Sequence, residues 1–264
     1  MTLKTKKEIQ AWLKKEYVEN DAYIIHDDLS IDLLADFHLV NDYQVLPVVF
    51  NLAKGDFFTN DSGLTSLKGF PLHVEKSLDI SGNALVSLEF CPQTVGGYFS
   101  ASHNELESLR FFPQSVKGDI RLNNNSLTHL SYLPSEVNGN LSLQYNELTS
   151  LKGCPQKLKN LDCSHNQLAS LEGVSQEIKE LTMHANHITS LKHLGVVHSI
   201  QANDNKINDF SYIPESLKYL YIKQNNHGEI QYLSLSDEEL EKFKLHHRLL
   251  ENMDEKPIKM RKKV

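Results

Sequence analysis

The chain has 264 residues, of which 40% are apolar and 23% are charged, with a mean hydropathy of -0.40. These values indicate a soluble globular protein and exclude a disordered or membrane-embedded chain. The net charge is -7, and residues 21–255 carry -14 by difference because residues 1–20 (+2) and 256–264 (+5) are basic. A body this acidic repels a phosphate backbone, so we expect no nucleic-acid partner.

The first forty residues contain no uninterrupted apolar run of seven or more behind a charged start. A secretory signal and a membrane span both need such a run. We therefore expect a cytoplasmic protein with no membrane span.

Residues 1–35 are expected to form an N-terminal cap. Ile9, Trp12, Leu13 and Tyr17 recur at helical spacing within residues 4–19, which predicts an amphipathic helix. Two short apolar runs, at residues 23–25 and 31–34, follow it and read as a hairpin.

Residues 36–230 contain a repeat of 19 to 21 residues, which we expect to fold as about nine coils. Its clearest marker is an asparagine in eight successive units: Asn83, Asn104, Asn125, Asn146, Asn166, Asn186, Asn205 and Asn225. Apolar residues precede each asparagine by five and three positions, and six of the eight prolines share one position of the unit. The two preceding units, at residues 36–40 and 56–60, have Asp42 and Ser62 at the turn.

Each column of the repeat has a physical interpretation. The alternating apolar pair predicts a short strand with one buried face, and stacked units pair these strands into a parallel sheet. The asparagine amide can bond the backbone of its own and the neighbouring coil. Too few residues remain in each unit for an ordinary helix, so the outer side is expected to be extended or 3₁₀-like.

The spacing falls from 21 to about 20 residues near residue 155. Three residues separate Val116 from Ile120, whereas two separate Leu158 from Leu161. The lost residue lies next to a glycine, where we expect a small bulge in the longer units.

The unit L-x-x-S-x-N-x-L-x-S-L-x-G-x-P resembles the short bacterial leucine-rich repeat of the YopM and IpaH effector group and of Legionella leucine-rich-repeat effectors. Residues 148–155 followed by 161–166 are close to that unit. The resemblance covers residues 36–230 and implies an α/β protein built as a single curved leucine-rich-repeat solenoid. It implies a parallel β-sheet on the concave face, an extended or 3₁₀ convex side and helical caps at both ends.

Residues 231–264 are expected to form a C-terminal capping helix and a basic tail. Ser236 and Glu239 form a capping box, and apolar residues continue a helix to about Asn252. The tail from Lys256 reads as a solvated end, or as a short address or membrane-surface patch. An acidic run before a basic end also resembles the translocation signals of Legionella-type secreted effectors, so secretion into a host cell stays open.

Catalytic chemistry is not expected. Cys91, Cys154 and Cys163 fit small buried core residues in a reducing compartment. The IpaH-like ligases carry a catalytic cysteine after their repeats, and no cysteine follows Cys163 here. The dense histidines His184, His187, His193 and His198 fall at four different repeat positions, so we expect no metal and no cofactor.

The concave face is the expected binding surface, because strand residues six, four and two positions before each asparagine point to it. Exposed aromatic residues and an arginine among acids are typical of binding hot spots. The candidate protein-binding residues are Phe58, Asp79, Tyr98, Asp119, Arg121, Asp162, His184, Tyr219 and Tyr221. An alternative for three of the aromatic residues is packing against the caps, with Phe58 under the hairpin and Tyr219 and Tyr221 against the C-terminal helix.

The sequence favours a non-catalytic, monomeric protein-binding module, a bacterial effector or regulator, whose partner has basic patches. One alternative is an inhibitor that occludes the active site of another effector or enzyme. A different class, an enzyme with an unrecognised site, is disfavoured.

Overall fold

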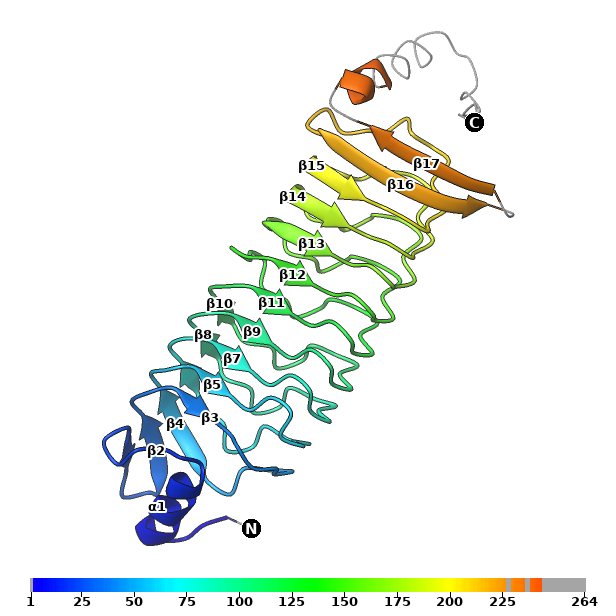
Figure 1. Ribbon diagram of the computed structural model, residues 1–264. Coiled ribbons are helices and arrows are strands. Elements are labelled where there is room, and N and C mark those ends of the chain that lie inside the picture. Colours follow the sequence, from blue (N-terminus) through cyan, green and yellow to red (C-terminus); the bar gives the residue numbers. More distant parts are fainter. Residues whose placement is uncertain (1, 227–228, 236–237, 244–264) are drawn as a thin grey trace.

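The computed structural model describes residues 2–226, 229–235 and 238–243. It shows a curved parallel β-solenoid of about ten turns. Its coils stack along one axis, with the only labelled helix at one end and a long hairpin near the other (Figure 1). Leucine, isoleucine, valine and phenylalanine side chains from every coil fill one continuous core.

The concave face carries an eleven-stranded sheet among the described residues. Ten neighbouring strands run parallel and in register, so one position of the repeat forms one column across the sheet. These strands and the final one, which is antiparallel, are β3 (Phe37–His38), β5 (Phe57–Phe58), β7 (Leu78–Asp79), β9 (Phe99–Ser100), β11 (Ile120–Arg121), β12 (Leu141–Ser142), β13 (Asn160–Asp162), β14 (Glu177–Thr182), β15 (Val196–Gln201), β16 (Tyr219–Asn226) and β17 (Glu229–Leu235).

A second sheet has six strands, and most of them belong to the segments that precede the strands of the concave sheet in each coil. Its members are β1 (Tyr23–Ile25), β2 (Ser30–Leu33), β4 (Val49–Ala53), β6 (His73–Val74), β8 (Thr94–Val95) and β10 (Ser115–Val116). Of the two forms expected outside the concave sheet, the extended one is therefore found. None of the described residues forms a 3₁₀ helix.

The change of repeat length alters how the two sheets connect. In the longer coils a bend, which contains a glycine in most of them, separates two short strands, so a bend between two sheets takes the place of the expected small bulge. A Cβ on Gly118 would lie 2.9 Å from the backbone of both Gly97 and Tyr98, which explains the absence of a side chain there. In the shorter coils of β14 and β15 the bend is lost, and each strand runs through both positions as one strand of six residues.

The asparagine ladder has the predicted role in seven coils. The Asn146 Oδ1 accepts the Leu127 N–H at 3.0 Å, and its Nδ2 donates at 3.0 Å to the carbonyls of Leu122 and Leu143. Each amide thus joins its own coil to the preceding one. The eighth asparagine differs: Asn225 does not form a turn, because its backbone continues β16 and pairs with Ile230 of β17.

The N-terminal cap is a helix and a hairpin, as expected. Helix α1 (Lys6–Lys15) buries Ile9, Trp12 and Leu13. It is shorter than the spacing predicted: Tyr17 lies beyond its end, with a φ of 57° and an exposed fraction of 79%, and takes no part in the apolar face.

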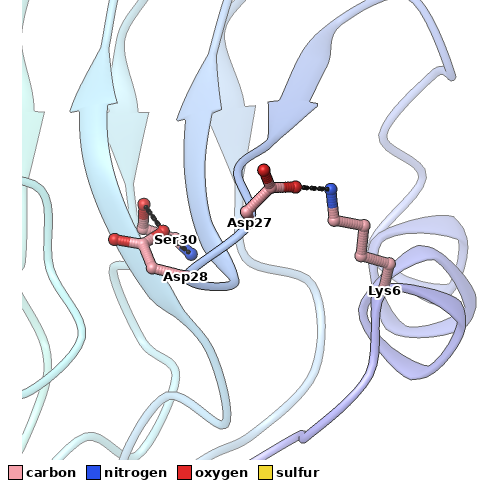
Figure 2. A network of polar contacts seen from close by, with 4 residues as sticks. All are labelled: Lys6, Asp27, Asp28 and Ser30. Carbon is pink, nitrogen blue, oxygen red and sulfur yellow. Dashed lines mark hydrogen bonds and ion pairs between the residues drawn. The ribbon is translucent and has the colours of Figure 1, made fainter.

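An exposed ion pair joins the helix of this cap to its hairpin. Figure 2 shows Lys6 of α1 donating to Asp27 in the β1–β2 turn at 2.9 Å, while Asp28 accepts the Ser30 N–H and hydroxyl within the same turn. The Lys6 ammonium holds the pKa of Asp27 below its usual value. This ion pair is fully exposed at its acidic end, so its contribution to stability is small.

A buried glutamate joins the helix end to the first coil. Glu16 is 3% exposed, and its carboxylate accepts the Val40 N–H at 2.9 Å and the Tyr43 hydroxyl at 2.8 Å. The Tyr43 oxygen in turn accepts the Trp12 indole N–H at 2.8 Å. Burial, followed by the bond to Glu16, raises the pKa of Tyr43 to about 12.

The C-terminal end contains a feature that the sequence did not suggest. Strands β16 and β17 form an antiparallel hairpin that crosses the expected boundary at residue 230. Of the expected helix at residues 236–252, residues 238–243 are described and are helical, and Phe243 packs edge-on against Phe210 at 5.6 Å between ring centroids. The remainder of that helix and the basic tail lie outside the described residues.

Asn146→Ala is expected to lower the free energy of unfolding by about 1–3 kcal/mol, because it leaves the buried N–H of Leu127 without its acceptor. The carbonyls of Leu122 and Leu143 each lose one of two amide donors. Urea denaturation measures the change. The matched control is Asn138→Ala, an exposed residue outside the ladder, with an expected change within about 0.5 kcal/mol. Equal effects of the two substitutions would contradict the stabilising role of the ladder.

Candidate functional site

The parallel register places all nine candidate residues on the eleven-stranded sheet or its immediate flank. It does not bring them together into one site. Phe58, Tyr98, Arg121 and their acidic neighbours Asp79 and Asp119 gather in the first half of the solenoid. Asp162, His184, Tyr219 and Tyr221 lie in later coils.

The first group is organised around Tyr98. Its ring stacks on Phe58 with a centroid distance of 6.0 Å and an interplanar angle of 30°. The Arg121 guanidinium carbon lies 4.7 Å from the centroid of the Tyr98 ring, within cation–π distance. Phe58 in turn contacts His38 edge-on at 5.0 Å. We call His38, Phe58, Tyr98 and Arg121 the concave stack.

The concave stack spans coils that are not adjacent. In register, Asp79 of β7 lies beside Phe58 of β5, and Ser100 of β9 lies beside Arg121 of β11. The Tyr98 side chain thus reaches back two coils to Phe58. The intervening positions of the sheet carry the acidic Asp79 and the small Ser100.

Carboxylates surround the stack and are held in place by backbone amides. Asp56 accepts the Ser77 N–H at 2.8 Å, and Asp119 accepts the Asn140 N–H at 2.8 Å. The second oxygen of Asp119 lies 4.0 Å from the Arg121 guanidinium, the outer limit of an ion pair. Burial and the charge of Asp79 raise the pKa of Tyr98, with Arg121 opposing them, so the phenol stays protonated at neutral pH.

The rings that contact Phe58 belong to the concave face. Phe58 is half-buried, and its ring partners are His38 and Tyr98, with no ring of the hairpin among them. Tyr219 and Tyr221 are 57% and 40% exposed, so the C-terminal end of the described chain leaves much of both side chains in solvent.

His38 is the residue of this site that the sequence analysis missed. It belongs to the same column as Phe58, one coil earlier, because β3 and β5 pair with His38 opposite Phe58. The signal was present: His38 precedes Asp42 by the same four positions that separate the other members of the column from their asparagines.

Asp162 and His184 serve the backbone of later coils. Asp162 accepts the Ser164 N–H at 3.0 Å and the Gln144 side-chain amide at 2.6 Å. The Nδ1 of His184 accepts the Asn203 N–H at 3.0 Å, which requires that nitrogen to be unprotonated. Burial lowers the pKa of His184, and the nearby His165 adds to this, while Asp162 and Asp204 oppose it.

The three cysteines occupy the core. All are free thiols; Cys154 and Cys163 are buried, and Cys91 is partly buried. Burial raises the pKa of Cys154 to about 12 and raises the pKa of Cys91 and Cys163 as well. A thiol is a poor nucleophile unless it is ionised, so these side chains are not arranged for thiolate chemistry.

The described part of the chain contains no group of three or more histidine, cysteine, aspartate or glutamate side chains placed to hold a metal ion. Within the same residues, the search for a helix with the length and apolarity of a membrane span finds none.

The geometry defines the class of protein: this is a leucine-rich-repeat-like solenoid, as the resemblance predicted. Among solved structures, the chain is similar to YopM from Yersinia enterocolitica WA-314, with a TM-score of 0.53 and 25% identical residues. The match covers 72% of this chain and 50% of that one, so the chain spans half the length of the YopM structure. No protein-family model matches the sequence, and the comparison with curated proteins gives no match.

The bond to His184 predicts a pH dependence of stability. Because the folded state lowers the pKa of His184 below its ordinary value of about 6.5, the stabilisation is complete above that pH. It is lost as the pH falls toward the folded-state pKa. Urea midpoints measured at pH 7.5 and 5.0 should therefore fall further in the wild type than in His184→Asn, which does not titrate. Identical pH dependences would refute this role.

Proposed function

We propose that this chain is a non-catalytic, monomeric protein-binding module that engages one specific protein through its concave face. The concave stack carries the proposal. A half-buried aromatic pair capped by an arginine is the kind of surface that supplies most of the binding energy in protein interfaces. It lies on a rigid sheet, so little conformational entropy is lost when a partner docks.

The charge of the surface favours a partner with basic side chains. Asp56, Asp79 and Asp119 surround Tyr98, and backbone bonds hold Asp56 and Asp119 in place. Fixed carboxylates next to an aromatic ring suit a lysine or arginine of a partner, which can contact the ring and a carboxylate together. Similarity of fold to YopM supports a bacterial effector or regulator, active in the cytoplasm or secreted into a host cell.

A partner whose active site faced the concave sheet would be occluded, and the module would then act as an inhibitor. Titrating a partner enzyme with this chain distinguishes inhibition from recruitment. An inhibited enzyme loses its activity, whereas a recruited one keeps it.

Tyr98→Ala combined with Arg121→Glu is expected to weaken capture of the partner by about 1000-fold, since each of the two hot-spot residues contributes about 2 kcal/mol. Affinity capture on immobilised protein with quantitative mass spectrometry identifies the partner, and titration of the purified partner gives the affinity.

The matched control is Phe111→Ala with Arg110→Glu. Arg110 lies over the Phe111 ring at 4.9 Å, so this pair has the same chemistry and charge change outside the concave sheet. Retained binding by the concave variant, with its circular dichroism spectrum unchanged, would overturn the proposed site.

A further inference from the structure

One surface column, at the corner where the outer segments lead into the concave sheet, becomes basic in the second half of the solenoid. It occupies the exposed position directly after a buried residue of each coil. The column reads Glu75, Gly96, Lys117, Asn138, Lys159, Lys179, His198 and Lys218, and every member is exposed. Basic residues are thus concentrated in the second half of the solenoid, in a chain whose net charge is -7.

Neighbouring members of the column are directly adjacent in the backbone ladder. The Lys179 N–H donates to the Lys159 carbonyl at 2.9 Å, and the Lys218 N–H donates to the His198 carbonyl at 2.9 Å. Adjacent coils lie about 4.8 Å apart, and like charges placed side by side on neighbouring strands are destabilising. Stability of the solenoid therefore does not explain this arrangement.

Acidic side chains of the described residues compensate the column only weakly. Lys179 lies 3.9 Å from Glu180, at the limit of an ion pair. Lys159 and Lys218 make no ion pair with a described carboxylate. Their positive charge is thus available to an anionic ligand.

A groove of about 680 Å³ opens beside the column. Lys159, Lys179 and His198 are among its lining residues. Val196 and the ion pair of Lys157 with Glu177, 3.4 Å apart, line it as well. Because the side chains of a strand alternate, the floor between these residues is the backbone over buried Leu158 and Ile178. The side chain of Val196 is 48% exposed and adds an apolar contact surface at one end.

We propose that this groove binds an extended, acidic segment of a partner protein that also carries apolar side chains. The segment lies along the solenoid axis, with its carboxylates on Lys159 and Lys179 of the groove and on Lys218 beyond it, and with an apolar side chain on Val196. This site is separate from the concave stack and extends the function proposed above to a second surface.

A peptide fits the groove better than a nucleic acid. Glu180 beside the column would repel a continuous phosphate backbone, whereas a peptide can place a neutral residue there. The exposed Val196 offers nothing to a phosphate but contributes to binding an apolar side chain.

Fluorescence anisotropy with the full chain tests the proposal. The probe is a labelled peptide of three Glu-Leu-Glu-Gly repeats, and its reference is the same peptide with glutamine in place of glutamate. We expect saturable binding of the acidic peptide, at least about 10-fold tighter than the reference. Lys159→Glu with Lys179→Glu should weaken binding of the acidic peptide by about 10-fold or more relative to the wild type. The milder Lys159→Gln with Lys179→Gln should give an intermediate loss of affinity.

The matched control is Lys54→Glu with Lys68→Glu, which makes the same charge change at exposed lysines of the first half and should alter the affinity less than about twofold. Equal losses in the two variants would show a general charge effect and overturn the site. Failure of the acidic peptide to bind below about 1 mM, or tighter binding of a labelled twelve-nucleotide oligothymidylate, would overturn it too.

Discussion

The buried asparagine amide is the interaction on which the rest of the structure depends. A coil that turns sharply inward exposes backbone N–H and C=O groups to the core, where water cannot reach them. The amide of residues such as Asn146 satisfies one N–H and two carbonyls at once, in its own coil and in the preceding one. It therefore fixes the stacking register as well as the turn. Because the register is fixed, side chains of equivalent position line up, and single repeat positions become continuous surface columns.

The length of the repeat decides what lies next to these columns. In coils of 21 residues, a glycine bend separates two sheets, and Gly118 allows its coil to approach the one before it closely. The second sheet stops at β10, one coil before the repeat shortens, and the isolated pairings of Glu136 with Lys157 and of Lys157 with Glu177 continue its line. In the later coils β14 and β15 run straight through the position of the bend. The groove of the second half lies in this region. A one-residue change in the repeat thus alters the form of the surface, as well as the course of the chain.

Features present in every coil could be predicted from the sequence, whereas contacts that occur at a single place in the chain could not. The leucine and asparagine columns, the parallel sheet and the first two degenerate strands follow from a signal repeated in each coil. The contact of Tyr98 with Phe58 skips a coil, so no rule of adjacent register predicts it. The Glu16 network depends on where α1 ends, and the β16–β17 hairpin replaces an asparagine turn whose residue, Asn225, is present. Caps have no neighbouring coil to repeat, so their contacts are set by single residues.

The concave stack and the cationic groove differ in charge but share one scaffold. From the coil of Tyr98 to that of Lys179 there are four steps, about 19 Å along the axis. In a solenoid each coil contacts its neighbours alone, so substitutions this far apart should act independently on stability. Any coupling between them in binding must therefore come through a ligand that touches both. A partner with a basic surface and an acidic extension would show such coupling in a double-mutant cycle, and two separate partners would show none. The coupling free energy of that cycle therefore distinguishes one partner from two.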